Sequence, residues 1–412
     1  MRFADGGLLI ENISAAELAR RFGTPVYVYE AGVIRRQIAN VQRAFSRLPF
    51  RPFYAMKANG ALGILRMVKA AGFGCDCVSP GEIFLARHAG FQAEDIWFTC
   101  SNVSDEDMRA IPDERIVVNV NSMSEIDRVL RLDLRNPIAL RINPDVGAGH
   151  HADVVTAGGG VKFGIDLGEV EAARMVVEDA GRQVVGIHAH IGSGIDDLGP
   201  LLRAAGTLLQ LSGDFPNLRF INFGGGISVP YRPGESDFPI MTYGEELTAI
   251  ADSRLRARNL QAILEPGRYV VAQAGTLLAR ITATRISGGY EWIGCDTGFN
   301  HLVRPSKYGA YHHIVNASRG PETATRDVVV AGNICESGDV FTRDAAGHVV
   351  PRAIAGPRIG DLLAFRDAGA YGFSMASHYN ARLLPPEVLV DGDDTRLMRK
   401  RQTLERLLEG QE

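Results

Sequence analysis

Several short apolar runs in this 412-residue sequence end in an ionisable residue or in glycine. Lys57 ends the run "PFYAMK", where an unpaired buried ammonium would be costly to desolvate. Five other runs end in polar or glycine positions: Asp76, Arg141, His190, the run Gly224, Gly225 and Gly226, and Glu265 followed by Gly267 and Arg268. A single residue of this kind is most simply explained by pairing with a neighbouring charge or by contact with solvent. Several of them at the ends of neighbouring strands indicate an active site.

The residue types at these positions suit a cofactor that carries a phosphate. The triple glycine, the stretch "IGSG" (Ile191 to Gly194) and a nearby arginine would offer backbone N–H groups and positive charge to a phosphate monoester. A triple glycine alone also occurs in a bare tight turn. Together with an amine, an imidazole that can stack on a ring and a carboxylate, the pattern predicts pyridoxal phosphate. Lys57 would then form the Schiff base, and Glu265 would keep the ring nitrogen protonated.

Eight strands are predicted from short β-branched or aromatic runs, which alternate with segments of helical period. The runs are "PFYAMK", "GCDCVS", "DIWFTC", "RIVVNV", "PIALRIN", "VVGIHAH", "LRFINFG" and "AILEPG". Eight alternations over roughly 240 residues predict an α/β fold, a (β/α)8 barrel. Enzymes with this barrel carry their chemistry at the carboxyl ends of the strands, where the polar residues above are placed.

The chain is expected to form two domains. Residues 27–268 are predicted to be the barrel, which would bind the cofactor. Residues 1–26 and 269–412 are predicted to form a mainly β domain, a β-sandwich or barrel. The reason is that strand-like runs separated by turns replace the helical period after Arg268.

The glycine-rich stretch "PDVGAGHHADVVTAGGGVKFGID" is too long for an ordinary strand–helix connection, so we expect a functional loop over the barrel mouth. Its two histidines, His150 and His151, are candidate substrate contacts. His188 is expected to face the other way from the histidine at the strand end and to be structural. Solvated or core roles are expected for His312 and His313.

Composition favours small-molecule chemistry. The net charge is -4 and no basic block is present, so neither nucleic acid nor a membrane surface is expected as a partner. No apolar run reaches the ~18 residues needed to span a bilayer, and the N-terminus lacks the features of a secretion signal. The five cysteines do not suggest a disulfide framework, and Cys75 and Cys77 are predicted to pack in a strand without binding metal. We expect a cytoplasmic enzyme.

Seven motifs occur together along the chain: "YAMKANG", "HAHIGSG", "FGGGISVPY", "EPGRYVVAQAG", "RPSKYGAYHH", "CESGDVF" and "GAYGFSMASHYNARLLPPEVLV". In this combination, which extends from "GTPVYVYE" to "RQTLERLL", the sequence resembles the fold-type III pyridoxal-phosphate decarboxylases. Among these it is most similar to the bacterial diaminopimelate decarboxylases, whose barrel is like that of alanine racemase. The resemblance covers nearly the whole chain.

The resemblance implies a role for each matching residue. Lys57 resembles the Schiff-base lysine, His190 the residue that stacks on the pyridine ring and Glu265 the partner of the ring nitrogen. Asp76 resembles a supporting acid near the lysine. The implied phosphate ligands are Ser193, Gly224, Gly225, Gly226 and Tyr371, and Arg141, Gly267 and Arg268 are also placed at the cofactor. The implied substrate-binding residues are Arg268, Arg304, Tyr308, Glu336 and Tyr371.

The resemblance also implies a reaction and an assembly. Cys335 resembles the residue that protonates the carbanion, and in this family it comes with Glu336 from the second subunit of a homodimer with shared active sites. The implied reaction decarboxylates meso-2,6-diaminopimelate at its D centre to L-lysine and CO2. A distal carboxylate and ammonium need both an arginine and an acid, here Arg304 and Glu336, whereas an ornithine-type relative has the acid without the arginine.

Three other interpretations stay open. One is a related decarboxylase of another carboxylated diamine or a carrier-linked amino acid. A second is an amino-acid racemase on a similar barrel and β domain, which the long cysteine-bearing C-terminal motif disfavours. The third is a non-catalytic regulator, which the presence of Lys57, Glu265 and Cys335 disfavours.

Overall fold

The computed structural model describes residues 2–4, 7–99, 101–149, 151 and 155–411. The chain forms two compact units. The first, which we call the β unit, contains Met1–Arg36, Pro230–Ser236 and Val270–Glu412, and the second, the barrel unit, contains Gln37–Val229 and Asp237–Tyr269. Within the described residues, no helix combines the length and the apolar composition needed to cross a membrane.

The barrel unit contains a closed ring of eight parallel strands, so the predicted α/β barrel is confirmed. The strands are β5 (Phe50–Ala55), β6 (Gly74–Cys77), β7 (Ile96–Thr99), β8 (Val117–Val120), β9 (Ile138–Asn143), β11 (Val184–His188), β12 (Phe220–Asn222) and β13 (Gln261–Leu264). Each pairs with the next in this order, and β13 pairs with β5 to close the ring. The short β10 (Ile165–Asp166) adds to β9 outside the ring. All eight runs predicted as strands form this barrel.

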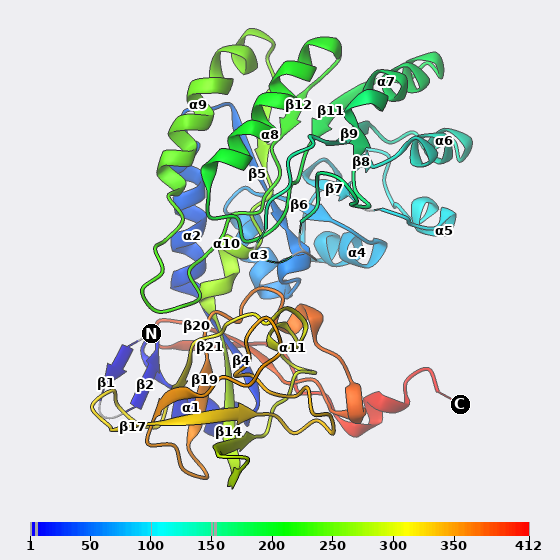
Figure 1. Ribbon diagram of the computed structural model, residues 1–412. Coiled ribbons are helices and arrows are strands. Elements are labelled where there is room, and N and C mark those ends of the chain that lie inside the picture. The colour runs from blue at the N-terminus through cyan, green and yellow to red at the C-terminus, as the bar shows by residue number, and fades with distance from the viewer. Residues whose placement is uncertain (1, 5–6, 100, 150, 152–154, 412) are drawn as a thin grey trace. The chain divides into compact units, whose positions relative to one another are not determined.

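Helices of the barrel unit surround the strands (Figure 1): α2 (Ala31–Ala44, beginning in the β unit), α3 (Leu62–Ala70), α4 (Pro80–Ala89), α5 (Asp105–Arg109), α6 (Met123–Arg131), α7 (Val170–Asp179), α8 (Leu198–Leu211), α9 (Ile240–Ala257) and α10 (Arg268–Val271). Serine side chains cap three of them. Ser79, Ser104 and Ser122 accept hydrogen bonds from the third backbone N–H of α4, α5 and α6. Because the first N–H groups of a helix lack partners within the helix, these caps fix where each helix begins.

Aromatic side chains fill the barrel towards the amino ends of the strands. Trp97 lies between Phe53 and Phe220, with ring centroids 4.6 and 4.3 Å away. Gly186 leaves room for this cluster, because a Cβ built there would lie 1.9 Å from the Phe220 ring. The interior is therefore packed at this end, and the polar groups gather at the other.

The β unit is built on one large mixed sheet, which confirms the predicted mainly β character. Its order is β18–β17–β15–β14–β4–β20–β21, with β19 pairing β14 and β16. The bounds are β4 (Val26–Glu30), β14 (Gly275–Ser287), β15 (Tyr290–Cys295), β16 (Ile314–Asn316), β17 (Thr325–Ala331), β18 (Arg352–Ala355), β19 (Leu362–Phe365), β20 (Glu387–Asp391) and β21 (Asp394–Arg399). The chain start adds β1 (Arg2–Ala4), β2 (Gly7–Ile10), β3 (Ile13–Ser14) and α1 (Ala15–Phe22), and α11 (Arg304–Tyr308) follows β15.

The compact units differ from the predicted domain boundaries at two places. Strand β4 pairs with β14 on one side and with β20 on the other, so the β unit extends past residue 26 to Arg36. Pro230–Ser236 also belongs to the β unit, although it lies in the middle of the predicted barrel segment. The sequence near β4 carries no sign of its partners, because they follow it by more than 240 residues.

Candidate active site

Most of the residues predicted for the barrel site follow the carboxyl ends of the strands. Lys57 lies in the one-turn helix η1 (Met56–Ala58), directly after β5, and Asp76 lies in β6, one residue before its end. Glu265 directly follows β13, and His190 follows β11 by two residues. Because parallel strands end on one side of a barrel, these side chains share the same mouth.

Glu265 is a buried carboxylate that two side chains stabilise in its charged form. Asn222 Nδ2 donates to Oε1 over 2.5 Å, and His188 Nε2 lies 3.2 Å from Oε2. Burial alone would raise the pKa of Glu265. The contact with His188 and the positive charge of Lys57 outweigh burial and hold this pKa below its usual range. Glu265 is therefore ionised at neutral pH.

Asp76 differs from Glu265 because its carboxyl group keeps its proton at neutral pH. Its side chain is buried, and neither carboxyl oxygen has a hydrogen bond of good geometry. Burial and the nearby charge of Glu265 raise the pKa of Asp76 to about 8, while Lys57 and the hydroxyl of Thr99 lower it in part. The two neighbouring acids thus have separated pKa values, and the barrel mouth holds one carboxylate and one neutral carboxyl at neutral pH.

The imidazole of His190 is held against the glycine run. Its Nδ1 accepts a hydrogen bond from the backbone N–H of Gly225 over 3.0 Å. Burial lowers the pKa of His190 well below its usual range, and the charges of Lys57 and Arg141 lower it further. The ring is therefore neutral, and a neutral ring can stack on an aromatic cofactor without adding charge.

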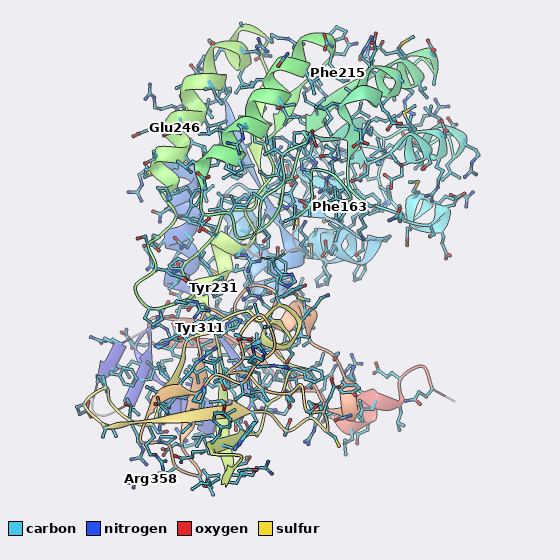
Figure 2. All side chains as sticks on the ribbon, viewed as in Figure 1. Phe163, Phe215, Tyr231, Glu246, Tyr311 and Arg358 are labelled. Atoms are coloured by element: carbon cyan, nitrogen blue, oxygen red, sulfur yellow. The ribbon has the colours of Figure 1, made fainter. Side chains whose placement is uncertain are left out.

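Two arginines complete the barrel mouth. The guanidinium of Arg141 lies 4.4 Å from the ring centroid of Phe163, a residue labelled in Figure 2, and burial lowers the pKa of Arg141 to about 10. Arg268, in the short helix α10, donates to Ser193 Oγ over 2.8 Å. The structure therefore brings the hydroxyl of the "IGSG" stretch next to a buried positive charge.

The glycine run is packed so closely that no side chain fits. A Cβ at Gly224 would lie 2.3 Å from the carbonyl oxygen of Ala189, and one at Gly225 would lie 2.2 Å from that of Glu265. Gly224 also has φ of +70°, in the left-handed region that favours glycine. The backbone N–H groups of Gly224 and Gly225 donate to Asn222 Oδ1 and His190 Nδ1, so the run forms a tightly packed turn that excludes side chains. Gly267 is similarly confined, with its Cβ position 3.0 Å from the carbonyl oxygen of Ala55.

The remaining predicted residues lie in the β unit. Arg304 begins α11 and is fully buried, with its guanidinium 4.7 Å from the ring centroid of Tyr231. Arg304 Nη1 lies 2.9 Å from His312 Nε2, and His312 Nδ1 lies 2.9 Å from the carbonyl oxygen of Arg366. Since a guanidinium only donates and a carbonyl only accepts, His312 is a neutral ring that orients Arg304.

Arg304 lies in a cationic and aromatic cluster. Tyr311, labelled with Tyr231 in Figure 2, lies beneath two further guanidinium groups, those of Arg232 at 4.4 Å and Arg352 at 4.0 Å. Tyr308 ends α11 and is half-buried. Tyr371 follows β19 in the left-handed region, with φ of 56°.

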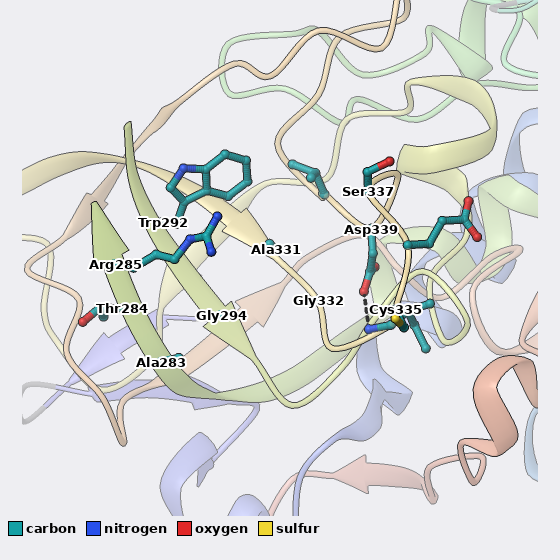
Figure 3. A pocket seen from close by; sticks show the side chains of 13 residues that line it. Ala283, Thr284, Arg285, Trp292, Gly294, Ala331, Gly332, Cys335, Ser337 and Asp339 are labelled. Atoms are coloured by element: carbon teal, nitrogen blue, oxygen red, sulfur yellow. Dashed lines mark hydrogen bonds between the residues drawn. The ribbon is translucent and has the colours of Figure 1, made fainter. Parts of the chain in front are cut away.

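Cys335 and Glu336 lie on an exposed loop of the β unit. Asp339 holds this loop by accepting hydrogen bonds from the backbone N–H groups of Ile334 and Phe299, and the backbone N–H of Cys335 donates to Asn380 Oδ1 over 2.7 Å. The loop borders an open cavity of about 720 Å³ (Figure 3), which β14, β15 and β17 also line. Figure 3 shows Asp339 bonded beneath the loop, with Arg285 and Trp292 on the facing strands.

Sequence reasoning missed residues that orient Glu265 in the barrel unit and Arg304 in the β unit. His188 was expected to face away from His190, and this was wrong, because it is buried and contacts Glu265. Residues two apart on a strand point to the same side, so the strand period correctly predicts that His188 and His190 face the same way. His312 was expected to have a solvated or core role, and it is buried as a partner of Arg304. His150 lies outside the described residues.

One mouth of the closed parallel barrel holds an amine, a charged and a neutral carboxyl group and the glycine run. This combination defines an enzyme that holds a phosphate-bearing aromatic cofactor. Residues 31–272 match the family model described as "Pyridoxal-dependent decarboxylase, pyridoxal binding domain". The diaminopimelate decarboxylase of Methanothermobacter thermautotrophicus is 41% identical, with 98% of this chain and 96% of the relative covered. That of Escherichia coli K12 is 39% identical, with 98% and 97% covered. The crystal structure of the Helicobacter pylori diaminopimelate decarboxylase complexed with L-lysine aligns with a TM-score of 0.87 at 30% identity, covering 96% of this chain and 98% of that one.

The chain belongs to the pyridoxal-dependent decarboxylases, within the diaminopimelate decarboxylase family. The resemblance drawn from the motifs is thereby confirmed, and pyridoxal phosphate is the cofactor of this enzyme. The residues present fit that group. The glycine run admits no Cβ, Asp76 has two buried oxygens without well-formed hydrogen bonds, and Glu265 is kept ionised as a partner for a protonated ring nitrogen.

Proposed function

We propose that this enzyme decarboxylates meso-2,6-diaminopimelate at its D centre to give L-lysine and CO2. The observation that carries the substrate assignment is the buried, oriented guanidinium of Arg304, because a distal carboxylate needs a fixed positive charge. Two relatives named diaminopimelate decarboxylase, at 41% and 39% identity over nearly the full chain, support the same reaction. The alternative is a related decarboxylase of another carboxylated diamine or of a carrier-linked amino acid.

We assign the cofactor to the barrel mouth. Lys57 would hold it covalently, His190 would stack on its ring, and Glu265 would pair with its ring nitrogen. The remaining cofactor ligands are proposed to be Asp76, Arg141, Ser193, Gly224, Gly225, Gly226, Gly267, Arg268 and Tyr371. When bound, pyridoxal phosphate supplies an aldehyde that links to an amine and a ring that accepts the electron pair left by loss of CO2.

The chain's own residues control charge and protons around that chemistry. Glu265 stays ionised through its contacts with Asn222 and His188, so it can hold a proton on a ring nitrogen. Asp76 is a neutral carboxyl at pH 7 in the cofactor-free protein, so it adds no second negative charge next to Glu265. Cys335 is proposed to donate the proton that completes the product, directly from Sγ or through a water that it positions.

Substrate recognition is assigned to the residues that the resemblance implies. The α-carbon end of the substrate would meet Lys57 and Arg268, and the distal end would meet Arg304, Tyr308, Glu336 and Tyr371. A guanidinium and a carboxylate together match the carboxylate and the ammonium of the distal end. A substrate with only a distal amine would bring a positive charge towards the buried Arg304 and offer it no carboxylate, which disfavours ornithine.

We further propose a homodimer in which each active site takes Cys335 and Glu336 from the second subunit. The exposure of Cys335, Glu336 and Ser337 supports this proposal, because a proton donor left on a surface needs another surface to exclude water. The cavity beside these residues has room for side chains of a second copy. The cytoplasmic location expected from the sequence stays a prediction.

The substrate assignment is tested with diaminopimelate, ornithine and arginine as separate substrates, followed by amino-acid analysis. Diaminopimelate alone should be turned over efficiently. Arg304→Gln should lower kcat/KM for diaminopimelate by roughly 30-fold or more, since loss of a buried charge partner in binding costs about 2–5 kcal/mol. Arg358→Ala, an exposed position in the β unit, is the matched control. Comparable turnover of ornithine by the native enzyme would favour the alternative decarboxylase.

A further inference from the structure

His188 lies at the carboxyl end of β11 and is completely buried in the barrel unit. One ring nitrogen, Nε2, lies 3.2 Å from Glu265 Oε2. The other, Nδ1, lies 2.8 Å from the amide nitrogen of Asn119, a buried residue of β8. The three side chains therefore form a continuous chain across the barrel interior, from β8 through β11 to the end of β13.

The chemistry of the two neighbours fixes where the proton lies on the His188 ring. An ionised carboxylate only accepts hydrogen bonds, so Nε2 must carry the proton that faces Glu265. Burial lowers the pKa of His188, although Glu265 raises it in part, and the ring therefore has one proton at neutral pH. Nδ1 is then an acceptor, and the Asn119 amide nitrogen is the donor that it needs.

Glu265 receives one donor on each oxygen in this arrangement. Asn222 donates to Oε1 and His188 donates to Oε2, so the carboxylate plane is fixed at both ends. Asn222 is itself oriented, because its Oδ1 accepts the backbone N–H of Gly224 over 2.9 Å. Removing the His188 donor would leave one oxygen of a buried carboxylate without a partner, which would favour protonation of Glu265.

We propose that His188, with its tautomer set by Asn119, is a positioning residue that keeps Glu265 ionised and oriented towards the ring nitrogen of the cofactor. This inference rests on the proposed role of Glu265 as the partner of that nitrogen. It gives the buried pair Asn119 and His188 a function in the reaction, and it distinguishes His188 from a histidine that only fills space.

The test measures cofactor binding with two matched variants. His188→Gln places an amide N–H near the position of Nε2, whereas His188→Asn places its amide near Nδ1 and leaves Glu265 without that donor. Each cofactor-free, full-length protein is titrated with pyridoxal phosphate and with 1-deazapyridoxal phosphate, which has C–H in place of the ring nitrogen. His188→Asn should weaken binding of pyridoxal phosphate by about tenfold, and His188→Gln should stay close to wild type.

Binding of the deaza probe separates positioning from packing. All three proteins should bind 1-deazapyridoxal phosphate with similar affinity, because no ring nitrogen is present for Glu265 to pair with. Equal weakening of both ligands by His188→Asn would show a merely structural role and overturn the inference. The same conclusion would follow if His188→Gln behaved like His188→Asn.

Glu265→Gln distinguishes failure of the inference from failure of the proposed function. If Glu265→Gln weakens pyridoxal phosphate but not the deaza probe while His188→Asn has no effect, Glu265 keeps its proposed role and His188 loses its own. If Glu265→Gln affects both ligands equally, the role of Glu265 is wrong and the inference fails with it. Turnover gives a second readout, since His188→Asn should lower kcat and leave KM for diaminopimelate nearly unchanged.

Discussion

Asp76→Asn should change how the stability of the cofactor-free protein depends on pH. The pKa of Asp76 is raised to about 8 by burial and by the charge of Glu265. The unfolded chain loses this proton near pH 4, whereas the folded protein keeps it until about pH 8. Between these values the folded state binds more protons, so the free energy of unfolding falls as pH rises.

The size of the effect follows from the slope of proton linkage. One proton changes the free energy of unfolding by about 1.4 kcal/mol per pH unit, so raising pH from 5 to 7 should destabilise the wild type by up to about 2.7 kcal/mol through this one group. The amide that replaces the carboxyl group in the variant has no proton to lose. The difference in unfolding free energy between the two proteins should therefore shift by about 2–3 kcal/mol in favour of the variant.

Urea unfolding of the cofactor-free proteins measures this shift. The chain has two tryptophans, Trp97 in the barrel unit and Trp292 in the β unit, so a Trp292→Phe background makes fluorescence report on the barrel. Asp127→Asn, at an exposed position of α6, is the matched surface control. If the free energies of unfolding of wild type and Asp76→Asn changed in parallel with pH, Asp76 would have the same protonation in the folded and unfolded states. That result would refute the reasoning.

Three further outcomes are expected. Lys57→Ala should fold but lose both the visible absorption of the bound cofactor and nearly all turnover, and retained turnover would contradict the proposed role of Lys57. Gly225→Ala should destabilise the protein by about 1–3 kcal/mol and weaken cofactor binding, because the new methyl group would meet the backbone of Glu265, whereas Gly206→Ala, where a Cβ meets nothing within 4 Å, should not destabilise it. An equal mixture of Lys57→Ala and Cys335→Ala subunits should recover roughly a quarter of wild-type activity after exchange, because half of the dimers are mixed and half of their sites are intact. No recovery after exchange demonstrated by mass spectrometry would place both residues in one chain.

The fold of the barrel unit was predictable because its signal is local. Each strand is a short apolar run, and eight such runs alternating with helical segments match few architectures. The rule that chemistry follows the carboxyl ends of barrel strands then selected Lys57, Asp76, His190 and Glu265, and the structure gathers them at one mouth. Their proposed roles remain predictions.

The missed residues depend on contacts between distant parts of the chain. Arg304 is oriented by Tyr231 and His312, and nothing in the sequence near residue 231 indicates that it meets residue 304. His188 contacts both Asn119 and Glu265, which lie in or directly after two other strands. The one local sign of this arrangement was Asn119 itself, a polar residue inside the apolar run "RIVVNV". Local patterns thus identify groups that can react, and tertiary packing decides which side chains orient them.

The pairing of β4 has a consequence for synthesis of the chain on the ribosome. All five residues of β4, "VYVYE", are buried between β14 and β20 in the finished sheet. Glu30 and its partner Val390 are 360 residues apart, so at about 5–20 residues per second β4 emerges roughly 20–70 s before that partner. The barrel segment can fold during this interval. Strand β4 has neither neighbour until β14 appears, about 250 residues after it, and it keeps one unpaired edge until β20 follows. The growing chain therefore exposes a segment that chaperones can bind and that unpaired strands of other chains can capture.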